Sequence, residues 1–148
     1  MNVVGVAEVV ATLCCGLFAG ASVYVSLVEH PARMSCGTKL AATEFGPSYR
    51  RAALMQASLA AAGAIAAVVV WLGSANVGWA IGGVLLGAVI PYTLIAILPT
   101  NKRLLDAGLD RESEETHRLL VRWGRLHAVR SVMSVAALVI FLWLLTAE

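Results

Sequence analysis

Four apolar stretches dominate this sequence, and each is long enough to cross the hydrocarbon core of a bilayer as a helix. They cover residues 3–28, 52–72, 77–98 and 128–146, whereas a helix needs only about 20 residues to span that core. Composition agrees, because 14% of the residues are charged, against about 25% in soluble domains, and the mean hydropathy is +0.81. We predict an all-α fold: an integral membrane bundle of four antiparallel helices forming one domain over residues 1–148.

The connections between these stretches differ in length and charge. Residues 73–76, Gly-Ser-Ala-Asn, form a tight turn, so the second and third helices should pair as a hairpin. The other two connections, 29–51 and 99–127, are long, and every Lys and Arg lies in or beside them. Since Lys and Arg in short loops favour the cytoplasm, we expect both long connections there. Both termini should lie on the other side of the membrane, which we take to be a bacterial inner membrane.

Prolines and acidic residues suggest where the helices begin and end. Gly46-Pro47 is predicted to separate a short helical segment from the second span, and Pro99 to end the third. The acidic run at 110–115 suits a helix N-terminus. The fourth helix should therefore begin in the cytoplasm as an amphipathic segment and run through residue 146, for a length of about 54 Å at 1.5 Å per residue.

Cysteines and small residues are expected to serve packing. Cys14, Cys15 and Cys36 form no paired motif and are predicted to be buried small apolar residues. Small residues are spaced for close helix contact within the bundle at Gly16, Gly20, Gly83 and Gly87. The alternative use of these faces is to build a homo-oligomer.

Unusual polar residues occur where the four spans should meet at the cytoplasmic interface. They are Glu29, His30, Tyr49, Gln56, Asn101, Trp123, His127 and Arg130. Trp123, His127 and Arg130 stand at positions i, i+4 and i+7 and so share one helix face, which we expect to point into the bundle. Ionisable side chains inside a membrane bundle are costly and usually mark a pathway or a site.

Simpler roles exist for several polar residues. Trp, Tyr and Arg are common anchors at headgroup depth, and we assign only that role to Arg33, Arg50, Arg111, Arg118, Arg122 and Arg125. His30 and Asn101 could equally cap helix ends. His30 and His127 with Glu29 have the donors of a two-His-one-carboxylate iron site, yet no local ligand spacing supports a metal. We expect neither a metal nor an organic cofactor.

Five segments, taken in order, resemble the anthrone oxygenase-like family of small four-helix membrane proteins, most of which have no assigned activity. They are GLFAG at 16–20, VEHPA at 28–32, YRR at 49–51, PTN at 99–101 and WGRLHAVR at 123–130. The resemblance extends over almost the whole chain. Characterised members oxidise anthrones to anthraquinones, so it implies a monooxygenase-type oxidoreductase.

The implied chemistry needs few groups. An anthrone carries a doubly benzylic CH₂ whose anion reacts with O₂ without metal or flavin, so an enzyme needs a base, a donor for the developing oxyanion and a dry pocket. His127, whose unperturbed pKa is about 6.5, would be the base, and Arg130 and Asn101 the oxyanion donors. We expect a pocket open toward the cytoplasmic leaflet and bounded by the first, third and fourth helices. Its substrate-binding residues would be Glu29, His30, Trp123, Tyr49 and Tyr92, with Glu29 balancing the charge of a histidine or of Arg130.

Two other classes of function stay open. A non-catalytic four-span module could bind a lipid, a small hydrophobic ligand or a protein partner using only the anchors and the small-residue faces. A proton or solute carrier would need a continuous polar path, for which the membrane interior offers only Ser22, Ser26, Ser58, Thr93, Ser131 and Ser134. The expected partners are the bilayer and a hydrophobic small molecule, with no nucleic acid.

Overall fold

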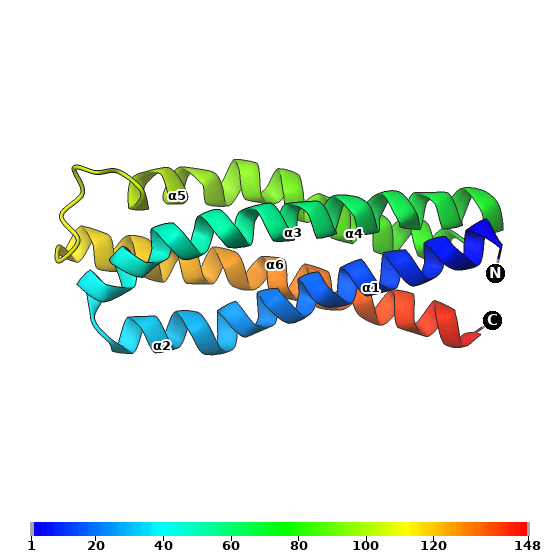
Figure 1. Ribbon diagram of the computed structural model, residues 1–148, viewed down its shortest axis with the longest axis horizontal. Coiled ribbons are helices and arrows are strands. Elements are labelled where there is room, and N and C mark those ends of the chain that lie inside the picture. The colour runs from blue at the N-terminus through cyan, green and yellow to red at the C-terminus, as the bar shows by residue number, and fades with distance from the viewer. Residues whose placement is uncertain (1, 148) are drawn as a thin grey trace.

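Four long helices lie side by side in the computed structural model, which describes residues 2–147. The helices cover Val3–Ser35, Thr38–Ser74, Val77–Leu104 and Glu114–Ala147, and each is long and apolar enough to cross a membrane. Successive helices run in opposite directions, and the two ends of the chain lie at the same end of the bundle (Figure 1). The predicted all-α bundle of four membrane helices is therefore confirmed.

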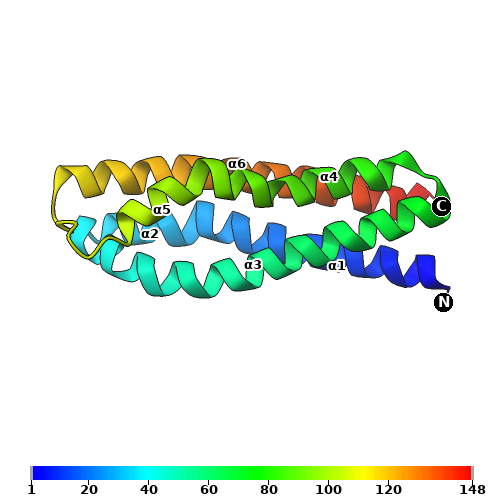
Figure 2. The same cartoon turned by 90° about the horizontal axis from the view of Figure 1, so that it is seen from above.

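Two of the four spanning helices are interrupted by a π-helical turn. The first consists of α1 (Val3–Tyr24), η1 (Val25–Glu29) and α2 (His30–Ser35), and the third of α4 (Val77–Tyr92), η2 (Thr93–Ile97) and α5 (Leu98–Leu104). The second and fourth are the single helices α3 (Thr38–Ser74) and α6 (Glu114–Ala147). Both α1 and α4 pack against α3 and α6, so α3 and α6 face each other across the bundle, as the two views indicate (Figures 1 and 2).

The helix ends follow local capping chemistry. Ala75, in the left-handed region at φ 56°, and Asn76, whose side chain accepts from the Gly78 N–H, close the predicted hairpin between α3 and α4. At the start of α6, the Ser113 hydroxyl accepts from the Thr116 N–H at 3.2 Å, and acidic residues occupy the first turn. The hydroxyl satisfies an amide group that a helix start leaves without a partner, and the carboxylates complement the helix dipole. The long fourth helix therefore begins in the predicted acidic run.

The predicted helix breaks at Gly46-Pro47 and at Pro99 are wrong. Pro47 lies inside the continuous α3, and the third spanning helix runs past Pro99 to Leu104. An interior proline costs about 3 kcal/mol, but the turns before Pro47 bury Ala41, Ala42 and Phe45 against the bundle. Tertiary packing therefore outweighs the local signal, and the first long connection shrinks to residues 36–37.

The π turns explain how the helices tolerate Pro31 and Pro99. In each case the residue just before the proline closes a wide turn, with the His30 N–H bonded to the Val25 carbonyl and the Leu98 N–H to the Thr93 carbonyl. A proline ring normally collides with the carbonyl four residues earlier. A turn that carries one extra residue moves that carbonyl away, so each helix continues past its proline.

Two apolar clusters fill the bundle at different depths. One includes Trp79 and Phe141, whose rings stack with centroids 5.0 Å apart. The other includes Phe45 and Trp123, in edge contact at 5.3 Å. The site described below lies between the clusters and is lined by residues of both.

Gly124 of α6 allows a close contact with α2. The His30 ring lies against it, so a Cβ at position 124 would come within 2.6 Å of the ring Nε2. The same ring packs on Trp123, with centroids 5.1 Å apart. Any side chain at this position must displace His30, and through it the indole of Trp123.

We expect Gly124→Ala to destabilise the protein by about 1–3 kcal/mol, because overpacking a filled site costs that much. Thermal unfolding in detergent, followed by near-UV circular dichroism, measures the change. Gly20→Ala is the matched control, since a Cβ there meets no atom within 4 Å and alanine favours a helix over glycine. An equal effect of the two substitutions would refute the role of the His30 contact.

The positive-inside bias predicts that the connection between α5 and α6 faces the cytoplasm. Ala107, exposed in that connection, and Asn76, at the opposite end, are suitable positions for single cysteines. Of the three cysteines predicted to be buried, Cys15 is buried, Cys14 is half-buried and Cys36 is exposed, so the prediction is wrong for Cys36. The parent protein should therefore carry Cys36→Ser. A membrane-impermeant maleimide should label Asn76→Cys in intact cells and Ala107→Cys only after the membrane is opened. The reverse pattern would invert the topology.

Candidate functional site

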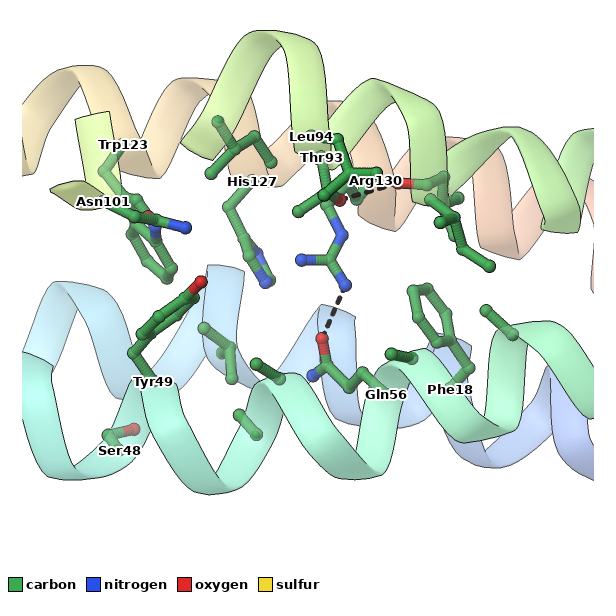
Figure 3. A pocket seen from close by; sticks show the side chains of 18 of the residues that line it. Phe18, Ser48, Tyr49, Gln56, Thr93, Leu94, Asn101, Trp123, His127 and Arg130 are labelled. Carbon is green, nitrogen blue, oxygen red and sulfur yellow. Dashed lines mark hydrogen bonds between the residues drawn. The ribbon is translucent and has the colours of Figure 1, made fainter. Parts of the chain in front are cut away.

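A pocket of about 200 Å³ lies between the two apolar clusters. All four spanning helices line it, and α3 supplies more of its wall than any other. The first, third and fourth helices bound the pocket as predicted, but the prediction left out α3. Most of the wall is apolar, with residues such as Phe18, Ala60 and Ile97, and a few polar side chains point into the space (Figure 3).

His127 lies at the centre of the polar part of this wall. Its side chain is buried and stacks on Trp123 with centroids 4.8 Å apart. The ring Nδ1 is 3.0 Å from the hydroxyl of Ser26 on η1. Trp123, His127 and Arg130 all line the pocket, as the spacing of four and three residues on α6 predicts.

Arg130 crosses the pocket from α6 toward α3. Its Nη2 donates to the side-chain oxygen of Gln56 at 2.7 Å (Figure 3), and its Cζ stands 5.3 Å from the centroid of the Phe18 ring. Among residues 2–147, the salt bridges do not include Arg130, and its Nε has no hydrogen-bond partner. The guanidinium is thus held by a neutral amide and an aromatic face, which leaves its charge available to an anion.

The end of the pocket toward α5 carries further polar and aromatic groups. Asn101 is 1% exposed, and its side-chain oxygen has no partner among the described residues. The indole nitrogen of Trp123 also lacks a described partner. Tyr49 stacks on Phe45, with rings 5.7 Å apart and nearly parallel at 4°. Buried polar atoms without partners are uncommon in proteins, so this wall can still bond to a ligand.

Three of the predicted site residues lie outside the pocket wall. Glu29 pairs with Arg33 and accepts from the Ser48 hydroxyl at 2.9 Å, so it contacts neither His127 nor Arg130. His30 is buried behind Trp123. The hydroxyl of Tyr92 donates to the Leu126 carbonyl at 3.2 Å, which ties α4 to α6.

Arg33 is not the exposed interfacial anchor that the sequence suggested. It is 6% exposed and lines the pocket. Its guanidinium pairs with Glu29 one turn earlier and with Glu44 on α3, where Nε and Oε2 are 3.0 Å apart, and its Cζ lies 5.9 Å from the Trp123 ring. The spacing of four between Glu29 and Arg33 signals such a pair in a helix, and extending the first helix past residue 28 would have revealed it.

The side chains of His30, His127 and Glu29 are of the types that could form a metal site, as noted from the sequence. Within residues 2–147 no three His, Cys, Asp or Glu side chains are grouped so that they could hold an ion. The structure does not bring these three donors together: Glu29 is engaged by Arg33, and Trp123 packs against both histidines.

Comparison with known proteins identifies the family. The sequence profile of the anthrone oxygenase family matches residues 45–140, which include most of the pocket wall. An anthrone oxygenase from Claviceps purpurea (strain 20.1) is 34% identical over 62 residues, an alignment that spans 36% of this chain and 36% of that protein. No solved structure matches the chain. On the strength of the profile match, the chain belongs to the anthrone oxygenase family.

Proposed function

We propose that the protein uses O₂ to oxidise an activated CH₂ group of a lipophilic aromatic ketone, without a cofactor of its own. The observation that carries this proposal is the cation of Arg130, held inside an apolar pocket beside His127 with no carboxylate neighbour among the described residues. A charge in apolar surroundings without an opposite charge is costly, and Arg130 is half-buried there. An enolate formed in the pocket would supply the missing anion.

His127 would act as the general base. It lines the pocket close to Arg130, on the same helix face, and a positioned histidine typically contributes about 10²- to 10⁴-fold to a proton transfer. Removing a proton from a carbon conjugated with a carbonyl group moves negative charge onto the carbonyl oxygen. Arg130 at one end of the pocket, or the amide of Asn101 at the other, would stabilise that charge more strongly in this apolar site than in water.

The reaction balances with O₂ as the only co-reactant. His127 takes the first proton from the CH₂ group, the carbanion gives electrons to O₂, and a C–O bond forms. The resulting peroxide anion takes a proton back from His127. Loss of the second C–H proton with cleavage of the O–O bond then yields a ketone and water, so one CH₂ and one O₂ become one C=O and one H₂O.

The walls of the pocket favour a flat aromatic substrate. Phe18, Phe45, Tyr49 and Trp123 border the space, and aromatic rings pack favourably in stacked or edge-on contacts. The Claviceps relative bears the name anthrone oxygenase, and an anthrone combines fused rings, a carbonyl group and an acidic CH₂. Such substrates and O₂ both dissolve in lipid, which suits a site between membrane-crossing helices.

We expect His127→Ala to lower anthrone-dependent O₂ consumption by at least about 100-fold, and Arg130→Gln by about 10²- to 10³-fold. Rates are measured with an oxygen electrode on protein in nanodiscs, after subtraction of the spontaneous oxidation of anthrone. His117→Ala and Arg122→Gln are matched controls, because both native side chains are exposed away from the pocket.

Wild-type activity in both His127→Ala and Arg130→Gln would contradict the catalytic assignment. A second outcome would also reject catalysis: the wild type oxidises no anthrone, and both variants bind an anthraquinone as tightly as the wild type does. The pocket would then belong to a module that binds hydrophobic small molecules.

A further inference from the structure

The side of His127 that faces away from the pocket carries a chain of hydroxyl groups. Its Nδ1 lies 3.0 Å from the hydroxyl oxygen of Ser26, which lies 2.8 Å from the hydroxyl oxygen of Ser131. The Ser131 hydroxyl in turn donates to the backbone carbonyl of Ser22 at 3.0 Å. Ser22 and Ser131 are buried, so water does not compete strongly for these bonds.

The direction of each bond follows from the last acceptor. The Ser131 hydroxyl lies within hydrogen-bond distance of two backbone carbonyl oxygens, that of Ser22 at 3.0 Å and that of His127 at 3.5 Å. A carbonyl oxygen can only accept, so we assign the single proton of Ser131 to these carbonyls, of which Ser22 is the nearer. The short contact between the two hydroxyl groups then requires the Ser26 proton to point at Ser131. Ser26 has no second proton, so its oxygen must accept from His127, and Nδ1 must carry a hydrogen.

We propose that Ser26 and Ser131 are positioning residues that hold neutral His127 as the Nδ1–H tautomer. The lone pair then belongs to Nε2, which makes no hydrogen bond with any residue from 2 to 147 and is therefore available to substrate in the pocket that His127 lines. The catalytic consequence, that Nε2 is the basic atom, rests on the proposed function, whereas the tautomer itself does not.

The chain orients the ring and does not conduct protons away. It ends on a backbone carbonyl, which cannot pass a proton on. A proton taken up by Nε2 must therefore leave through the same atom, back to the peroxide anion in the pocket. The π turn η1 contributes to this arrangement, since it carries Ser26 toward α6, and such turns are frequent at functional sites.

Nitrogen NMR of the ¹⁵N-histidine-labelled protein in nanodiscs tests the proposal directly, because a protonated and a bare ring nitrogen have well-separated shifts. The His127 signals are identified by their loss in His127→Gln. At a pH where His127 is neutral, we expect a protonated Nδ1 and a bare Nε2. Ser26→Ala and Ser131→Ala should shift the population toward the other tautomer, whereas Ser26→Thr, which keeps the hydroxyl group, should not.

Activity supplies a second readout. Ser26→Ala should lower kcat by about 10- to 100-fold, the range for losing a partner that orients a metal-bound histidine, with little change in KM. Ser26→Thr should recover most of the lost activity. Ser58→Ala is the control, since that exposed hydroxyl bonds only to the Met55 carbonyl of its own helix.

A wild-type His127 with its hydrogen on Nε2, or a tautomer that does not change in Ser26→Ala, would overturn the proposal even if His127→Ala abolished catalysis. Conversely, the Nδ1–H tautomer could depend on Ser26 in a protein that oxidises no anthrone. In that case the positioning role of Ser26 would stand and the proposed reaction would be wrong. If Ser131→Ala fails to fold, the half-buried Ser26 still decides the outcome.

Discussion

Lipid offers no hydrogen-bond partners, so a polar group within the bundle must be satisfied by the protein or by a ligand. Two arginines that line the pocket meet this constraint in opposite ways. Arg33 has a carboxylate on each side, from Glu29 and Glu44. Arg130 has the neutral amide of Gln56 and the face of Phe18. In the first arrangement the cation already has carboxylate partners, and the pair with Glu44 joins α2 to α3. In the second arrangement the cation gains a partner of opposite charge only when an anion binds.

The position of the pocket follows from the two π turns. Each precedes a proline, and the residues of both turns contribute to the wall, with Val25 from η1 and Thr93 and Ile97 from η2. The same widening that accommodates Pro31 places the Ser26 hydroxyl against His127. One backbone irregularity thus serves both the continuity of the helix and the geometry of the site.

Features set by apolar length, by turn residues or by the helical period were predictable from the sequence. The number of spans follows from apolar length, the hairpin between α3 and α4 from its turn residues, and the shared face of Trp123, His127 and Arg130 from helical spacing. The helix ends were not predictable, because packing of Phe45 and its neighbours outweighs the local cost of Pro47. The contacts of Arg33 with Glu44 and of Arg130 with Gln56 were missed for a different reason. A side chain's partner on another helix depends on rotation about the helix axis, which the sequence of that helix does not specify.

The most direct test of the central claim is the ionisation state of a bound ligand. A hydroxyanthraquinone is suitable because its phenolate absorbs at longer wavelength than its phenol, and it cannot be oxidised at a CH₂ group. At a pH where the free compound is neutral, we predict that the wild-type protein binds it as the phenolate and that Arg130→Gln binds it as the neutral phenol. A neutral ligand in both proteins would show that the Arg130 cation does not hold an anion in the pocket.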